Sequence, residues 1–141
     1  MENILLACPS EKEVGRNLKK TPESEYTGMV FQALRHLNDT EPEGTTVICP
    51  FVVPRSIVRH KLNSMEVCDV LYILRVKGWE TDGDIERLAT EALAQGKSEF
   101  FLTPYIADGL KFSLTPTDEP HLDSFDLEGI PKWMAPGLPS S

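Results

Sequence analysis

The chain has 141 residues, of which 40% are hydrophobic and 26% are charged, and its formal net charge is −8. This length suits one domain with a sizeable core, and the composition is that of a folded protein. The acidic balance argues against binding to a nucleic acid polymer, because such binding depends on clustered Lys and Arg. A single nucleotide stays compatible with this charge, since it needs only local donors and a shaped pocket. An acidic surface that imitates nucleic acid for a basic partner is compatible as well.

The three cysteines show no CxxC pair and no histidine at a spacing that suits a metal. Cys8, Cys49 and Cys68 each lie in or beside an apolar run, which favours buried thiols in a reducing compartment over disulfides or a zinc site. No signal peptide is recognised, and no run reaches the ~18 apolar residues of a membrane helix. A cytoplasmic protein without a membrane partner is therefore expected.

Four strands are predicted along the chain. Each is a short run of apolar or β-branched residues, which is typical of a strand buried in a parallel sheet. Pro9, Pro54 and Pro104 follow three of these runs and are expected to end them. Residues 69–76 are almost continuously apolar, so this strand is expected at the centre of the sheet. The predicted strands are residues 3–8, 45–51, 69–76 and 99–103.

Three helices are predicted between these strands. Thr21 and Pro22 form a helix start, and apolar residues then recur at helical spacing over about residues 22–38. Residues 55–67 show a weaker helical pattern. The third helix lies within residues 78–97, after an acidic turn that contains glycine.

Strands that alternate with helices predict a single three-layer α/β domain over residues 1–114. Its sheet is expected to be mostly parallel, with four or five strands, and Rossmann-like. Ligands bind such sheets beyond the carboxyl ends of the strands, so function is expected in the loops after residues 8, 51 and 76. Residues 115–141 are acidic and rich in proline. They predict a tail that wraps the domain or a partner, or stays partly disordered, with Trp133 and Met134 as a docking anchor.

The acidic turn and the third helix carry candidate site residues. Asp82 is placed to cap the helix, and Gly83 lets a backbone or a ligand come close. Glu86 lies in the first turn, about 90° from the apolar stripe, while Trp79 either packs under the turn or stacks on a base or sugar. Acids at a helix start also complement the helix dipole without any substrate. The stripe expected to face the core is Ile85, Leu88, Ala89, Ala92 and Leu93.

Three fragments, in this order, resemble the nucleoside 2-deoxyribosyltransferase-like superfamily, especially its small bacterial and phage members. They are residues 6–10 (LACPS), residues 67–74 (VCDVLYIL), and the run that begins with GWE at residue 78 and ends with Gly96-Lys97. The similarity covers about residues 3–103. The resemblance implies cleavage of the N-glycosidic bond of a nucleoside or nucleoside monophosphate, by hydrolysis or by deoxyribosyl transfer, through a carboxylate nucleophile.

Carried onto this chain, the resemblance implies Glu86 as the nucleophile, with Asp82 or Asp84 as the acid that orients the leaving base. It implies a nucleoside or nucleotide as the ligand, a homo-oligomer whose neighbours complete each other's sites, and neither a metal nor a cofactor. Together with the expected loops, it gives these substrate-binding candidates: Cys8, Pro9, Ser10, Phe51, Trp79 and Gly83.

The sequence departs from the family at the nucleophile. An alignment without gaps from Trp79 to Gly96 places Leu88 at the family's glutamate, and Glu86 takes that role only if the turn is two residues shorter. Three interpretations follow. The first is an enzyme with a shifted glutamate, and the second is a protein of the same fold, such as a phage protein, that sequesters a nucleotide without cleaving it. The third is an acidic protein-interaction module whose tail carries recognition.

Overall fold

The computed structural model describes residues 2–10, 13–14, 23–52, 65–118 and 123–126. These residues form an α/β structure around one five-stranded sheet, in the order β2-β1-β3-β4-β5. The first four strands in this order run parallel, and β5 runs antiparallel to β4. The strands are β1 (Asn3–Ala7), β2 (Thr46–Ile48), β3 (Val70–Leu74), β4 (Ser98–Ile106) and β5 (Leu110–Pro116). The prediction of an α/β fold with a mostly parallel sheet is confirmed.

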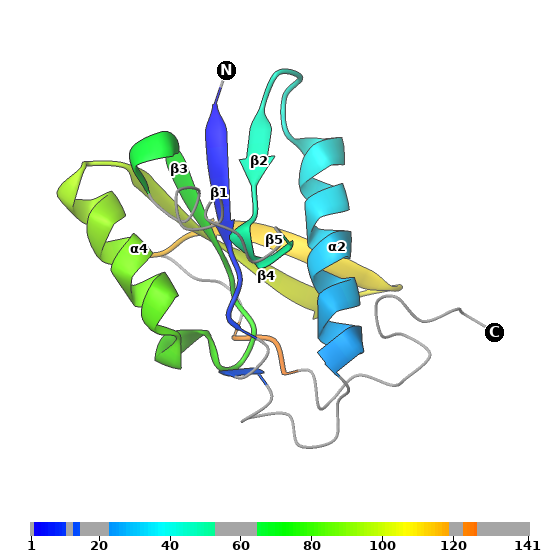
Figure 1. Cartoon of the computed structure of the whole chain (residues 1–141). Coiled ribbons are helices and arrows are strands. Elements are labelled where there is room, and N and C mark those ends of the chain that lie inside the picture. The colour runs from blue at the N-terminus through cyan, green and yellow to red at the C-terminus, as the bar shows by residue number, and fades with distance from the viewer. Residues whose placement is uncertain (1, 11–12, 15–22, 53–64, 119–122, 127–141) are drawn as a thin grey trace.

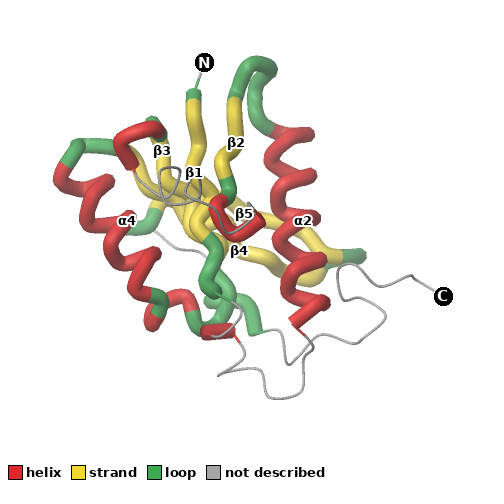
Figure 2. Tube along the Cα trace, in the orientation of Figure 1, coloured by secondary structure: helices red, strands yellow, loops and turns green. Residues whose placement is uncertain are grey.

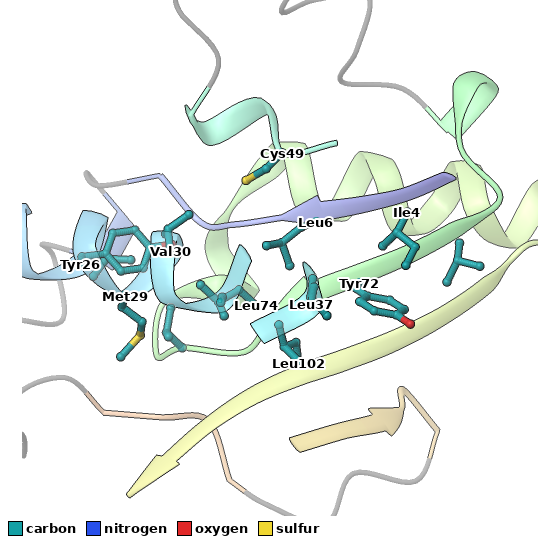
Figure 3. Close-up of a cluster of buried hydrophobic side chains, with 14 residues drawn as sticks. Ile4, Leu6, Tyr26, Met29, Val30, Leu37, Cys49, Tyr72, Leu74 and Leu102 are labelled. Carbon is teal, nitrogen blue, oxygen red and sulfur yellow. The ribbon is translucent and has the colours of Figure 1, made fainter. Parts of the chain in front are cut away.

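Two helices of the described chain cover opposite faces of the sheet, α2 (Glu23–Thr40) and α4 (Gly83–Ala94) (Figures 1 and 2). Alternate residues of β1 divide between the two layers: Leu6 packs toward α2, whereas Leu5 packs toward α4. All five residues of β3 are buried, as expected for a central strand. Figure 3 shows the core on the α2 side, where Tyr26 and Leu37 of the helix pack over the strands.

Two strand boundaries differ from the prediction. The predicted strand 45–51 is shorter, because its final residues form a tight 3-10 turn at Pro50–Val52. The fourth strand does not end before Pro104 but continues to Ile106. The reason is that pairing with β3 stops at Leu102, so Pro104 is not required to donate an N–H toward β3 and pairs only with β5.

The hairpin between β4 and β5 was not among the strands predicted along the chain. Its signal is Asp108-Gly109, since both residues have positive φ (58° and 102°), which is typical of tight hairpin turns. The strand β5 reaches Pro116, two residues into the predicted tail.

Other predictions concern the helices and the tail. The helix predicted over about 22–38 is confirmed as α2. Residues 55–64 of the predicted helix 55–67 lie outside the described residues, and its end forms a 3-10 turn at Met65–Val67. Trp133 and Met134 also lie outside them. No helix in the described ranges is long and apolar enough to cross a membrane.

The predicted apolar stripe of α4 is correct except at its end. Ile85, Leu88 and Ala92 are buried, and Ala89 is partly buried against the same core. Leu93 was expected to be buried but is 77% exposed. It lies about 100° around the helix from Ala92, which turns it away from the sheet in the last turn.

Candidate functional site

The loops predicted to carry function meet at one edge of the sheet. The strand β1 lies between β2 and β3 in the sheet, so the chain continues from β1 to β2 on one side and then crosses to β3 on the other side of β1. Ligands of α/β sheets bind at such a reversal of strand order, outside the carboxyl ends of the strands. This carboxyl edge comprises residues 8–10 after β1, residues 49–52 after β2 and residues 75–82 after β3. It lies at the lower end of the sheet in Figure 1.

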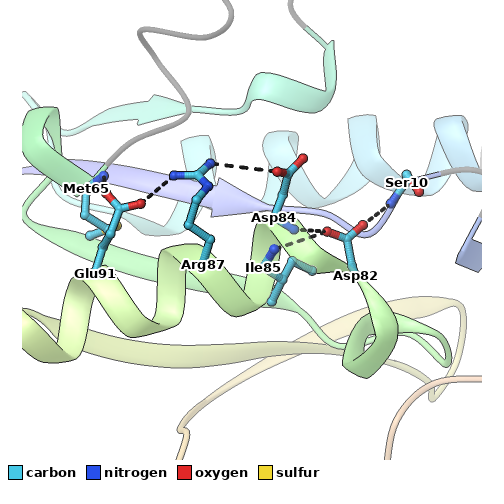
Figure 4. A network of polar contacts seen from close by, with 7 residues as sticks. All are labelled: Ser10, Met65, Asp82, Asp84, Ile85, Arg87 and Glu91. Atoms are coloured by element: carbon cyan, nitrogen blue, oxygen red, sulfur yellow. Dashed lines mark hydrogen bonds and ion pairs between the residues drawn. The ribbon is translucent and has the colours of Figure 1, made fainter.

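Asp82 joins the loop after β1 to the start of α4. One carboxylate oxygen, Oδ1, accepts the backbone N–H groups of Asp84 (3.0 Å) and Ile85 (3.1 Å), and Oδ2 accepts that of Ser10 (2.8 Å) (Figure 4). The side chain is buried, with the residue only 6% exposed. The predicted helix cap is therefore confirmed, and both oxygens of this carboxylate are engaged by main-chain donors.

Asp84 belongs to a row of charges along one flank of α4. Its carboxylate lies 3.9 Å from Arg87, which also forms an ion pair with Glu91 (Figure 4). The other oxygen of Glu91 accepts the backbone N–H of Met65 (3.4 Å). This flank therefore faces the turn that precedes β3, and the same side of the helix start is tied to Ser10.

Glu86 lies on the other flank of the helix. At about 100° per residue, it is roughly 160° around the axis from Asp84. Its side chain is exposed, and its backbone N–H closes the first helical turn onto the Asp82 carbonyl (3.1 Å). The three predicted acids thus lie close together in the helix start but point in three directions: Asp82 inward, Asp84 toward the β1 side and Glu86 away from it.

Leu88, the position that the ungapped alignment gives to the nucleophile, is a core residue. It is 1% exposed and packs with Leu5 and Ile73 under α4. A carboxylate at this position would lie in the core rather than at the carboxyl edge.

The loops after β1 and β2 are fixed by a tyrosine of α2. The Tyr26 hydroxyl donates to the Pro9 carbonyl at 2.7 Å, and this contact is buried. Its ring meets the half-buried ring of Phe51 edge to face, with the centroids 5.4 Å apart. Tyr26 was counted only among the apolar residues of the helix, because nothing local to its sequence indicates a partner in another loop.

Two thiols face each other between the same loops. The Sγ atoms of Cys8 and Cys49 lie 3.8 Å apart, and Cys8 is half-buried while Cys49 is buried. Burial raises the pKa of the Cys8 thiol well above its ordinary value, and the hydrogen bond with Cys49 and the charge of Asp82 raise it further. At neutral pH this thiol is therefore protonated.

The carboxyl end of β3 is covered by residues 123–126. Phe125 pairs with the chain beyond β3: it donates its N–H to the Arg75 carbonyl (3.0 Å) and accepts the N–H of Lys77 (2.8 Å). The Trp79 indole N–H donates to the hydroxyl of Ser124 (3.1 Å). These contacts attach part of the predicted tail to the domain.

Trp79 and Gly83 are the remaining predicted site residues. The Trp79 ring is half-buried and meets Phe101 edge to face, with centroids 5.0 Å apart, so it packs under the turn. Gly83 is exposed, and a side-chain Cβ at this position would meet no atom within 4 Å. No group of three or more His, Cys, Asp or Glu in the described part of the chain could hold a metal ion.

A half-open cavity of about 550 Å³ lies at the other end of the sheet and was not predicted. It is formed between the end of α2 and the start of β2. The Glu41 carboxylate in its wall accepts the hydroxyl of Tyr72 at 2.7 Å. Its lining residues include Leu34, Leu37, Asn38, Glu41, Thr45 and Val47.

No family model matches the chain, and neither a curated protein nor a solved structure matches it. What is established is therefore the fold class, an α/β protein with a mostly parallel sheet, and the geometry of its carboxyl edge.

Proposed function

We propose that this protein binds a nucleoside or a small nucleotide at the carboxyl edge of its sheet and does not cleave the glycosidic bond. It would be a non-catalytic member of the nucleoside 2-deoxyribosyltransferase-like superfamily. Support for the superfamily comes from the positions of the three resembling fragments. Residues 6–10 end β1, residues 67–74 contain β3, and the GWE run leads into α4, so all three border the carboxyl edge.

The proposal that the protein does not cleave its ligand is carried by what occupies the expected catalytic positions. Asp82 accepts three main-chain N–H groups, and Leu88 fills the core. A nucleophile must lie within about 3–3.5 Å of the reacting carbon, free to attack it. Leu88, where the ungapped alignment places the nucleophile, carries no carboxylate, and Asp82, which the resemblance gives as an orienting acid, is already engaged by three main-chain donors. Glu86 is exposed, but it lies on the flank of α4 turned away from Ser10.

Among the described residues of the carboxyl edge, rings and main-chain atoms are the groups that we expect to bind the ligand. Phe51 is half-buried beside the loop after β1, and an aromatic ring stacks on any base. A second subunit, as the resemblance implies, would contribute further groups to this binding site.

Glycosidic cleavage is the second candidate, because Glu86 is an exposed carboxylate in the first turn of α4. One experiment separates the two. The full chain is incubated with deoxynucleosides, nucleoside monophosphates and NAD, and released base is measured by chromatography beside the thermal unfolding midpoint. The capture proposal expects a rise in the midpoint with at least one ligand and no free base, since a ligand that binds only the folded state stabilises it.

Other outcomes would overturn the proposal. Base release that disappears in Glu86→Gln would establish cleavage with Glu86 as nucleophile, and release that persists would assign it to another group. No stabilisation by any compound of the panel would reject nucleotide binding.

The position of the ligand is tested with a matched pair of phenylalanines. Phe51→Ala is expected to weaken binding about 5- to 150-fold, because stacking on one base contributes about 1–3 kcal/mol. Phe31, on the outer side of α2 and 56% exposed, provides the control, and Phe31→Ala should leave affinity unchanged. Equal losses in both variants would place the ligand elsewhere.

A further inference from the structure

The contact between Cys8 and Cys49 brings together two residues 41 positions apart in the chain. Each follows one of two neighbouring parallel strands, β1 and β2, and both side chains pack on the α2 side of the sheet. Figure 3 shows Cys49 at the margin of that core. The third cysteine, Cys68, is buried in the core on the α4 side. The chain therefore holds one thiol pair and one isolated thiol.

We propose that Cys8 and Cys49 form a dithiol site that a small-molecule disulfide, of the type of oxidised glutathione, converts into an intramolecular disulfide. This inference is independent of the proposed nucleotide and of any catalysis. It rests on the distance of 3.8 Å between the two sulfur atoms and on their different exposure.

The geometry requires a small movement only. The sulfur atoms of a disulfide are about 2.05 Å apart, so these two must approach by roughly 1.8 Å. The strand register pairs Leu5 with Ile48, so Cys8 and Cys49 are not directly opposite each other, and the distance between their sulfur atoms is what shows that the side chains meet. Rotation of the Cys8 side chain, in a loop at the surface end of β1, is the movement that needs least rearrangement.

The difference in exposure sets the order of the steps. Cys8 is half-buried and Cys49 is 4% exposed, so Cys8 meets the incoming disulfide first. The Cys8 thiolate attacks one sulfur of the small disulfide, a mixed disulfide forms, and the other half leaves as a thiolate. The Cys49 thiolate then attacks the Cys8 sulfur and releases the second half. The two protons of the protein thiols end on the two released thiols, so one disulfide is reduced and one is formed.

The surroundings of Cys8 make the exchange slow at neutral pH. Burial, Cys49 and the carboxylate of Asp82 raise the pKa of Cys8, and only the thiolate attacks. Tyr26 of α2 also contacts this loop, since its hydroxyl donates to the Pro9 carbonyl. The reaction is therefore expected to accelerate as the pH rises. Once formed, the bond would tie the loop after β1 to the loop after β2 across the carboxyl edge.

The test uses the full reduced chain, equilibrated with buffers of increasing ratio of oxidised to reduced glutathione at mildly alkaline pH. Free thiols are then blocked with an alkylating reagent in denaturant, and intact mass and proteolytic peptides are measured. The expected result is the joint loss of two of the three thiols, with Cys8 and Cys49 in one linked peptide and Cys68 alkylated.

Single variants resolve the order of attack. Cys68→Ser should form the same bond as the wild type. Cys49→Ser should accumulate glutathione on Cys8, whereas Cys8→Ser should keep Cys49 reduced over the same time. Circular dichroism verifies that each variant is folded. If a variant does not fold, the peptide map of the wild type alone tests whether Cys8 and Cys49 become linked.

Three results would overturn the proposal. The first is three alkylated cysteines in the most oxidising buffer, and the second is glutathione retained on Cys8 of the wild type without the internal bond. The third is a linked peptide that contains Cys68.

Discussion

Replacing Asp82 by alanine removes the connection between the loop after β1 and α4. Three backbone N–H groups lose their acceptor at once: those of Asp84 and Ile85 in the helix start, and that of Ser10. We expect Asp82→Ala to fold less stably than any single exchange of an exposed acid in this helix. The prediction follows from the role of Asp82 as a buried cap rather than a reactive group.

The magnitude follows from the two roles of the Asp82 carboxylate, the helix cap and the hydrogen bond to the loop after β1. Removing a helix cap costs about 0.5–2 kcal/mol, and a hydrogen bond to a charged group contributes about 1.5–3 kcal/mol. The free energy of unfolding should therefore fall by about 2–5 kcal/mol. With a urea dependence of about 2 kcal/mol per molar, the middle of the range for small proteins, the unfolding midpoint should shift by roughly 1–2.5 M.

Urea unfolding followed by circular dichroism measures this shift, with two comparison variants. Asp84→Ala removes an acid whose side chain is 73% exposed, and its ion pair with Arg87 is worth at most about 0.5 kcal/mol. Asp82→Asn keeps the oxygen that caps α4 but turns an amide toward the Ser10 N–H, so it should lie between the other two. If Asp82→Ala costs no more than Asp84→Ala, the assignment of Asp82 as the structural connection is wrong.

Three further exchanges test other parts of the structure. Leu88→Glu should unfold the chain, because it removes about 1.5–3 kcal/mol of apolar burial and places a charge in the core. Leu93→Glu, at an exposed position of the same helix, should change the free energy of unfolding by less than about 0.5 kcal/mol. Trp79→Phe and Ser124→Ala should each lower the free energy of unfolding by about 1 kcal/mol, because each removes the hydrogen bond between the two side chains. If this bond is their main interaction, the loss in the double variant should exceed the larger single loss by no more than a few tenths of a kcal/mol. Burial raises the pKa of Cys68 from 9.0 to about 11, so the unfolded chain releases this proton first and stability falls as pH rises from 9 to about 11. The difference in urea midpoint between the wild type and Cys68→Ala should therefore shrink or reverse between pH 9 and about pH 11. A difference that stays constant over this pH range would contradict the raised pKa of Cys68.

The elements of this fold that were predictable have a local signal. The β3 run is apolar at every position because both faces of a central parallel strand are buried. The helix α2 follows from the apolar spacing of its sequence, with a helix-start signal before it. The hairpin after β4 also has a local signal, Asp108-Gly109, whereas Pro104 predicts the end of the strand. A proline ends a strand only where its missing N–H would have to pair with a neighbour. The prediction fails because β3 ends opposite Leu102, which only the sheet register reveals.

The site was predictable only where its contacts are local. Asp82 caps α4 through the N–H groups two and three residues further along the chain, and an aspartate just before an apolar helical pattern predicts such a cap. Its bond to Ser10 joins residues 72 positions apart, and the thiol pair spans 41. Both depend on β1 lying between β2 and β3, an order that no run of residues encodes. Sequence therefore identifies the individual groups, while the sheet decides which of them meet.

That order also determines what the carboxyl edge can offer a ligand. The carboxylate of Asp82 contacts the loop after β1, and its charge is already shared among three N–H donors. Its use as a reactive group would require breaking a cap and a loop contact together. In the described part of the chain, the ends of β1 and β2 also carry a thiol pair, the Pro9 carbonyl and the ring of Phe51. Recognition by shape, stacking and main-chain contacts fits such a set, in line with the proposed capture of a nucleotide. The proposed exchange with a small-molecule disulfide would then act at the same edge through the thiol pair.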